Sequence, residues 1–300
     1  MNVADPAKAA NEAITLPGQA LARVTAVLVN YNSGPWLARS VRALKGRGAR
    51  FPEVIVLDNA SDDSSVDDLQ TMPGLKVIRL QENLGFGPGV NRAFQDVDTD
   101  YMLIINPDCL LVAEALVTLV SELDAHPEAG LTSGRIFDMG GNEQRGSRRQ
   151  LPGPRRVLNE VFRFRPGVGV DLTDLPAPLE AGPVEAVSGA CMLVRTEAFE
   201  QLGGFDPGFP MHFEDLDLMA RLQQADWSVR LVPTVAISHA GGVSSRRRPV
   251  KVMLAKHHGL WRYLNKHCRD RWPAWVRPFW WLGIWLHAAL MLPVSMWRRR

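Results

Sequence analysis

Short apolar runs separated by polar loops predict strands that alternate with helices along the chain. The run from Met102 to Ile105 holds four large apolar residues in succession, which is typical of a strand buried on both faces. Further runs at Val24 to Val29, Val54 to Leu57 and Leu75 to Leu80 predict three more strands. Helix-compatible stretches follow these strands at 36–44, 65–71, 90–95 and 111–123. This order favours an α/β fold with a doubly wound, mainly parallel sheet flanked by helices.

The second half of the chain is less regular. Residues 130–165 are rich in Gly, Pro and Arg, and we expect either a solvated flexible loop or a lid over a phosphorylated ligand. Order returns with a near-continuous apolar strand at 184–194, where Gly189 indicates close approach of the backbone to a ligand. A helix from about Asp215 and strands from Ser228 to His239 complete the domain, which we place at residues 23–245. Residues 1–22 are expected to form a loose extension.

Several strands end on side chains that suit chemistry. Pro107 cannot continue a ladder, so Asp108 follows a buried strand at the sheet edge where ligands of open α/β sheets bind. Asp108 is therefore a candidate for metal or phosphate binding, although it could instead cap the next helix. His239 closes the last strand in a glycine-flanked loop. Imidazole and carboxylate together are a normal ligand set for a divalent ion.

Acidic residues open the helix at Glu214. Leu218, Met219 and Leu222 share a helix face with Asp215, so this carboxylate points inward and needs a partner or a pocket. For Glu214 and Asp217, compensation of the helix dipole is an equally good interpretation.

A dinucleotide-binding Rossmann domain is the obvious alternative fold. The loop after the first strand reads Tyr31 to Pro35, without the glycine triplet that pyrophosphate binding needs. The glycines at 85, 87 and 89 follow the third strand instead, where a plain turn explains them equally well. We therefore disfavour NAD binding.

The ordered set of motifs resembles family 2 glycosyltransferases of the GT-A fold, and in particular the rhamnosyltransferase branch that builds bacterial polysaccharides. The segments that carry the resemblance span about residues 23–245 and are 27–32, 56–64, 83–91, 106–108, 203–206, 213–217 and 238–239. Each segment alone is weak evidence for this family, whereas the occurrence of all of them in the family's order is specific.

The resemblance implies a role for each matched residue. Asp58 would contact the base and ribose of the donor nucleotide, with the turn at 29–32 and the loop at 83–91 around it. Asp108 matches the last acid of the family's Asp-x-Asp metal motif, in which Asn106 replaces the first acid, and His239 matches a histidine that reaches the metal or diphosphate. Asp215, beside Glu214, matches the catalytic base. The implied donor-binding residues are Val29, Tyr31, Asn32, Asp58, Asn59, Asn83, Gly85, Asn91, Arg92 and Asn106, with Gly189 and Phe213 on the acceptor or sugar side.

The residue types suit this chemistry on their own. A Mg²⁺ or Mn²⁺ ion with hard ligands stabilises a departing diphosphate as a Lewis acid. A carboxylate within about 3 Å of the acceptor hydroxyl can take its proton. One such base implies a single displacement, and therefore inversion at the anomeric carbon.

Charge is distributed unevenly along the chain. Residues 241–300 hold 13 Lys and Arg against one acid, whereas the first 240 residues carry a net charge of −10. Residues 278–297 are almost free of charge, and tryptophans cluster around them. We expect residues 246–300 to form a helical region that lies on an anionic membrane surface. A spanning helix and a packed soluble helix remain alternatives, and nucleic-acid binding is disfavoured.

These observations predict an inverting transferase that moves a sugar, L-rhamnose from dTDP-L-rhamnose, to a lipid-linked or polysaccharide acceptor in cell-envelope biosynthesis. A UDP-hexose donor is the alternative, and a nucleotidyltransferase is disfavoured because no basic, glycine-rich triphosphate loop is present. Three scattered cysteines are typical of reduced thiols, and no export signal is visible. We therefore expect a cytoplasmic protein on the inner face of the plasma membrane.

Overall fold

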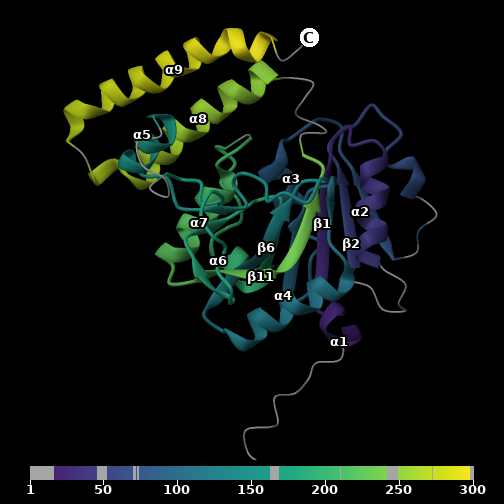
Figure 1. Cartoon of the computed structure of the whole chain (residues 1–300). Coiled ribbons are helices and arrows are strands. Elements are labelled where there is room, and N and C mark those ends of the chain that lie inside the picture. Colours follow the sequence, from purple (N-terminus) through teal and green to yellow (C-terminus); the bar gives the residue numbers. More distant parts are fainter. Residues whose placement is uncertain are drawn as a thin grey trace, which may run out of the picture.

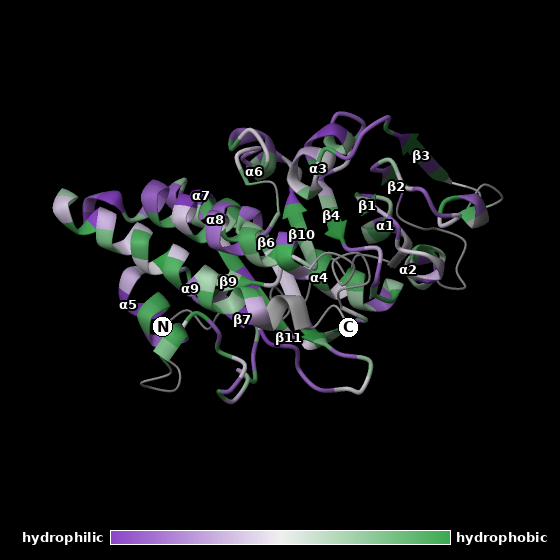
Figure 2. Cartoon of the chain, turned by 90° about the horizontal axis from the view of Figure 1, so that it is seen from above, coloured by the Kyte–Doolittle hydropathy of each residue, from purple (hydrophilic) through white to green (hydrophobic). Residues whose placement is uncertain are grey.

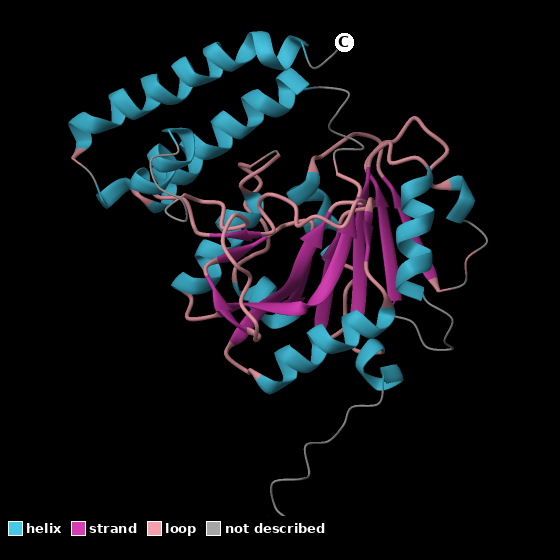
Figure 3. Cartoon of the chain, viewed as in Figure 1, coloured by secondary structure: helices cyan, strands magenta, loops and turns pink. Residues whose placement is uncertain are grey.

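The computed structural model describes residues 17–45, 53–69, 72, 74–162, 169–209, 211–241, 249–271 and 273–297. A central sheet is flanked by helices, and two further helices lie along one side of the molecule (Figure 1, Figure 3). The strands are β1 Val24–Asn30, β2 Glu53–Asp58, β3 Leu75–Arg79, β4 Tyr101–Ile105, β5 Cys109–Leu110, β6 Ala129–Phe137, β7 Arg148–Arg149, β8 Gly182–Val184, β9 Ala186–Val187, β10 Cys191–Arg195 and β11 Ser228–His239. The helices are α1 Pro17–Leu21, α2 Pro35–Lys45, α3 Phe86–Phe94, α4 Ala113–Ala125, α5 Pro154–Phe162, α6 Thr196–Gln201, α7 Glu214–Gln224, α8 Pro249–His267 and α9 Arg277–Trp297, with short 3₁₀ turns at Asp67–Leu69, Arg269–Arg271 and Ala274–Val276.

The main sheet has the order β3-β2-β1-β4-β10-β6-β11-β5, with β8 added beside β11. Strands β3, β2, β1 and β4 run parallel, and so do β6 and β11. Strand β10 is antiparallel to both of its neighbours, so it joins the two parallel parts. The predicted α/β class and mainly parallel sheet are confirmed.

Successive residues of the strands point to opposite faces of the sheet and pack into two apolar cores, one on each face. One core packs β1 residues such as Val24 and Leu28 against α2 and α4. The other packs Val27 and Val29 against α3, α6, α7 and part of α8. Because both faces are covered, the strands are apolar throughout, which is why their runs were visible in the sequence.

The structure corrects the expectation of irregular chain at 130–165. Strand β6 occupies the middle of the sheet, and α5 forms a helix within the same stretch. Gly134 makes this strand possible, because a Cβ there would lie 2.4 Å from the carbonyl oxygen of Val235 in β11. Residues 163–165 lie outside the described residues.

Two other boundaries differ from the sequence prediction. The strand expected at 184–194 is broken, because β9 pairs with β7 in a separate two-stranded sheet whereas β10 joins the main sheet. Gly189 lies in the turn between them. The loose extension expected over residues 1–22 is wrong for α1, where Ala20 and Leu21 are buried against α4. Residues 1–16 lie outside the described residues.

Helices α8 and α9 pack side by side as a hairpin, which agrees with the helical C-terminal region predicted from the sequence (Figure 1). Charged groups join α8 to α7: the fully buried Asp217 pairs with Lys266 at 2.7 Å and with His267 at 2.8 Å. A Cβ at Gly259 of α8 would lie 2.9 Å from the carbonyl oxygen of His212. The hairpin is therefore attached next to the turn that opens α7.

Helix α9 is largely apolar along its length (Figure 2), and several of its large apolar side chains are exposed. Phe279, Leu282, Leu286 and Leu290 are 58–66% exposed at helical spacing, and we call these four residues the α9 apolar face. Ile284 and Ala288 point inward and are buried. Among the described residues, no helix has the combined length and apolarity that crossing a bilayer requires.

Candidate active site

Three polar loops meet at the ends of β1 and β2. The Asn30 amide donates to Asp58 Oδ1 at 2.9 Å, and the Asn59 N–H donates to the Asn30 carbonyl at 2.8 Å. The Asn59 side chain donates to the Gly85 carbonyl at 3.0 Å and accepts from the Leu84 N–H at 2.8 Å. The loops predicted to surround a nucleotide are thus joined around Asp58, which is buried at the end of β2.

Other predicted donor residues lie in the same loops. Asn32 accepts a hydrogen bond from the Asp62 N–H at 2.9 Å, and the exposed Asn83 accepts one from the Gly85 N–H at 2.9 Å. Val29 packs against the first turns of α3, since a Cβ at Gly89 would lie 3.0 Å from its Cγ1. The half-buried Tyr31 follows β1 directly.

Asn91 and Arg92 have protein partners of their own. The Asn91 amide donates to the Phe205 carbonyl and accepts from the Phe205 N–H, both at 2.8 Å, so it ties α3 to the loop before α7. Arg92 pairs at 3.0 Å with Asp96, which follows the C-terminal end of α3. A role for these two residues in donor binding stays a prediction.

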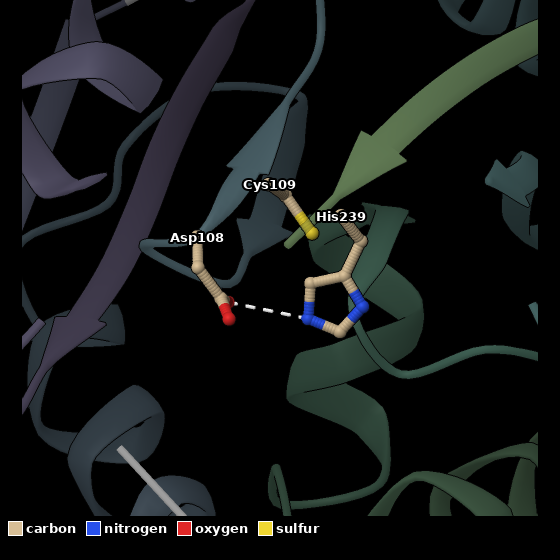
Figure 4. Close-up of side chains that lie close together, drawn as sticks. All are labelled: Asp108, Cys109 and His239. Carbon is tan, nitrogen blue, oxygen red and sulfur yellow. Dashed lines mark ion pairs between the residues drawn. The ribbon is translucent and has the colours of Figure 1, made fainter. Parts of the chain in front are cut away.

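Asp108 and His239 come together as the sequence predicted. His239 is the last residue of β11 and lies opposite Cys109 in the antiparallel pairing with β5. This pairing brings His239 Nε2 to 3.2 Å from Asp108 Oδ1 (Figure 4). Both side chains are mostly buried, with 9% of Asp108 and 16% of His239 exposed. A carboxylate oxygen and an imidazole nitrogen, both of which are atoms that can bind a divalent cation, therefore face each other.

Cys109 lies within reach of the same pair but does not suit the same ion. Its thiol donates to the Ala190 carbonyl at 3.4 Å, and burial raises the pKa of Cys109 well above its usual value. A protonated thiol is not a metal ligand, and Mg²⁺ and Mn²⁺ prefer oxygen and imidazole. Asp108 and His239 are therefore the candidate ligands of this group. All three cysteines are free, as predicted, and all three are buried.

Glu214 and Asp215 open α7 after a constrained turn. His212 and Phe213 both adopt left-handed backbone conformations, with φ of 63° and 72°. Asp215 Oδ2 accepts hydrogen bonds from the Gly189 N–H at 3.0 Å and from Arg149, and Oδ1 accepts one from the Leu216 N–H at 2.8 Å. The inward orientation predicted for Asp215 is confirmed.

The pKa values of the Glu214 and Asp215 carboxyl groups are shifted in opposite directions. Burial raises the pKa of Asp215, but the charge and hydrogen bond of Arg149 outweigh burial and hold that pKa below its usual value. Burial, reinforced by the charge of Asp215, raises the pKa of Glu214. Asp215 is therefore the ionised member of the pair and Glu214 the neutral one.

Main-chain contacts connect these groups into one site. The Asn106 N–H donates to the Ala190 carbonyl at 2.8 Å, which links the Asp108 loop to the turn that holds Asp215. A Cβ at Gly87 would lie 3.8 Å from Glu214 Cβ, so the first turn of α3 reaches the start of α7. The predicted nucleotide, metal and base residues thus occupy one edge of the sheet.

Sequence reasoning missed three residues of this site. The sequence places Asn30 in the turn at 29–32 without giving it a role of its own, and it does not distinguish Arg149 from the other arginines of residues 130–165. Gln144 was not singled out, although it contacts His239 twice. The basic composition of residues 145–156 was the only available signal, and it did not indicate which arginine reaches Asp215.

Comparison with known proteins decides the family. Residues 25–203 match the family model "Glycosyl transferase family 2". The chain belongs to glycosyl transferase family 2. It is accordingly a glycosyltransferase, and its architecture is the GT-A fold.

Relatives and solved structures agree with this assignment. The transferase is 30% identical to the N-acetylglucosaminyl-diphospho-decaprenol L-rhamnosyltransferase of Mycobacterium tuberculosis (strain ATCC 25618 / H37Rv), over 91% of this chain and 94% of the relative. It is 26% identical to the rhamnosyltransferase WbbL of Escherichia coli (strain K12), over 80% of this chain and 92% of the relative. The crystal structure of GalNAc-T7 with UDP, GalNAc and Mn²⁺ superposes with a TM-score of 0.58 and 16% identity, over 82% of this chain and 48% of that longer chain.

Proposed function

We propose that this transferase moves L-rhamnose from dTDP-L-rhamnose to a hydroxyl group of a lipid-linked glycan acceptor, with inversion, in cell-envelope biosynthesis. Two relatives aligned over most of their length are named rhamnosyltransferases, and the name of one specifies a sugar-diphospho-decaprenol acceptor. The observation that carries the proposal is the meeting of Asp108, His239 and Asp215 beside loops that are joined around Asp58.

The donor nucleotide would lie in these loops. Asp58 would face the base and ribose, with Asn59 holding the Gly85 loop against it. Asn106 would face the donor from the metal loop, since its backbone is fixed to Ala190 and its side chain is half-buried. The neutral, buried Glu214 and the strained Phe213 would shape the acceptor and sugar side next to Gly189.

Asp108 and His239 would hold a divalent ion, Mg²⁺ or Mn²⁺. The pair supplies one carboxylate oxygen and one imidazole nitrogen, which fits such an ion. When bound, the ion supplies positive charge that stabilises the departing diphosphate. A solved structure with the same fold contains UDP and Mn²⁺, which supports a divalent ion in general.

Asp215 would act as the base. A carboxylate offers about four lone-pair positions, and the described residues fill two at Oδ2 and one at Oδ1. The remaining position on Oδ1 can accept the proton of the acceptor hydroxyl. Arg149 keeps the carboxylate ionised, so the base is ready at neutral pH.

The α9 apolar face would lie on the inner surface of the plasma membrane, with the chain on the cytoplasmic side. Four large exposed side chains on one helix face suit the interface of a bilayer, and the net charge of residues 241–300 suits anionic lipid. A peripheral position of this kind gives access to an acceptor that is anchored in lipid. Nucleic acid is not part of this proposal.

The donor is tested by measuring thermal stabilisation of the purified protein with dTDP-rhamnose, dTDP-glucose, UDP-glucose and UDP-N-acetylglucosamine. Only the true donor should stabilise strongly. Preference for a UDP-hexose would replace rhamnose with the alternative donor. If no sugar nucleotide stabilises the protein, the proposed donor class is wrong.

The base is tested with Asp215→Asn, which keeps the shape of the side chain but cannot take the proton. We expect turnover to fall about 10²- to 10⁴-fold while donor stabilisation persists. The exposed Asp98 provides the control variant Asp98→Asn, which should transfer sugar at the wild-type rate. Wild-type turnover in Asp215→Asn would remove the base assignment.

A further inference from the structure

Gln144 contacts both the main chain and the side chain of His239. Its amide nitrogen donates to the His239 carbonyl oxygen at 2.7 Å, and its amide oxygen lies 2.8 Å from His239 Nδ1. A carbonyl oxygen can only accept, so the nitrogen end of the amide must face it. The oxygen end then faces Nδ1, and this ring atom must carry the hydrogen.

This arrangement determines what the other ring nitrogen can do. With the hydrogen on Nδ1, the lone pair of a neutral imidazole is on Nε2, which is the atom that lies 3.2 Å from Asp108 Oδ1. Figure 4 shows Nε2 directed at the Asp108 carboxylate while Nδ1 points away from it. A lone pair and a carboxylate oxygen repel each other unless a cation or a proton lies between them.

Gln144 is itself held in place. Its N–H donates to the Ile136 carbonyl at 2.8 Å and its carbonyl accepts from the Ser147 N–H at 2.9 Å, which anchors it beside the end of β6. Strand β6 runs parallel to β11 up to the pairing of Phe137 with Ser238. The amide therefore approaches His239 from the loop that follows β6, beside the end of that strand.

We propose that Gln144 is a positioning residue for the metal site: it fixes the Nδ1–H tautomer of His239 and aims Nε2 at the ion shared with Asp108. The inference rests on the metal assignment in the proposed function. Metal-binding histidines generally donate their second N–H to an oxygen in this way, and loss of that partner weakens metal affinity about 10- to 100-fold.

The test measures Mn²⁺ affinity by electron paramagnetic resonance, with the metal alone and with dTDP present. Gln144→Leu removes both contacts and should raise the Kd for Mn²⁺ about 10- to 100-fold. Gln144→Glu keeps an oxygen for Nδ1–H but loses the donor to the main chain, so its Kd should stay within about threefold of wild type. Gln223→Leu is the matched control, because Gln223 donates to the Glu185 carbonyl at 2.6 Å in another part of the fold, and its affinity should not change.

Nitrogen NMR of the metal-free protein gives a second measurement, with the His239 signals assigned by their loss in His239→Gln. Neutral His239 should carry its hydrogen on Nδ1 in wild type and should lose this preference in Gln144→Leu. The proposal is wrong if Gln144→Leu binds Mn²⁺ as wild type does, if Leu and Glu weaken it equally, or if wild-type His239 carries the hydrogen on Nε2. It is also wrong if wild type binds no Mn²⁺ in either condition.

These measurements involve no sugar donor or acceptor. Absence of sugar transfer would overturn the proposed function without changing the expected metal affinities. Conversely, a Kd that is indifferent to Gln144 would overturn this inference even in an active transferase.

Discussion

Gly189 lies so close to Asp215 that a single methyl group at this position should disturb the base. A Cβ at residue 189 would lie 2.6 Å from Asp215 Oδ2 and 2.9 Å from its Cγ. Ordinary contacts between such atoms are about 3.5 Å, so the turn and the carboxylate must separate by roughly 0.5–1 Å. The backbone of Gly189 does not have a positive φ, and the effect of Gly189→Ala therefore comes from this contact alone.

The displacement should affect turnover more than folding. A shift of about 1 Å in a catalytic group costs on the order of 10²-fold in rate, whereas one added methyl in a packed site costs about 1–3 kcal/mol of stability. The hydrogen bond from the Gly189 N–H to Asp215 would also lengthen from 3.0 Å. We expect Gly189→Ala to lower kcat about 100-fold and to leave the KM for the donor nearly unchanged, because the proposed function assigns nucleotide binding to the loops around Asp58 and the base to Asp215.

Initial rates of sugar transfer, measured with thermal unfolding of the same preparations, test this prediction. Gly182→Ala is the control, since nothing lies within 4 Å of a Cβ at residue 182 in the neighbouring strand β8. A folded Gly189→Ala protein with wild-type kcat would refute the claim that this contact positions the base.

Three further changes test other parts of the site and its surroundings. Arg149→Met should raise the pKa of Asp215, so the acid limb of the kcat/KM profile should move to higher pH; an unmoved limb would contradict the pairing. Burial alone would raise the pKa of Asp206, but the cations of α8 outweigh it and hold that pKa at about 2. The stability that comes from this lowered pKa is present above about pH 4 and is lost as the pH falls towards 2. Between these pH values, the free energy of unfolding in urea should therefore change less with pH for Asp206→Asn than for wild type. Leu286→Glu in the α9 apolar face should weaken sedimentation with anionic vesicles, whereas Leu179→Glu, at an equally apolar and 93% exposed position, should not; equal binding of both variants would count against the membrane surface.

The sequence predicted the first half of the fold well because each of those strands is buried on both faces. Such strands need apolar side chains at nearly every position, and β1, β2 and β4 leave a continuous signal. Strand β6 is equally central but contains Gly130, Thr132, Ser133 and Gly134. At the two glycines a Cβ would lie within 3 Å of Leu222, Trp227 or Val235. These small and polar residues interrupt the continuous apolar run from which the other central strands were predicted.

The acids of the site were predictable for a related reason. Asp58 and Asp108 follow buried strands, and Asp215 shares a face with apolar residues of α7, so each has an apolar pattern beside it. Arg149 has no such pattern. Its contact with Asp215 depends on how β7 pairs with β9, and two-residue strands are too short to leave a period in the sequence.

Gln144 shows where reasoning from patterns stops and geometry is needed. Its amide contacts the carbonyl oxygen and the Nδ1–H of His239, which is 95 positions away in the sequence. These groups come together through the register of β6 against β11 and of β11 against β5. A shift of one residue in either pairing would turn His239 to the opposite face of the sheet and separate it from both Asp108 and Gln144. The metal ligands and their positioning residue therefore depend on the same two registers, and residues that depend on register rather than on local sequence can be found only after the strands are placed.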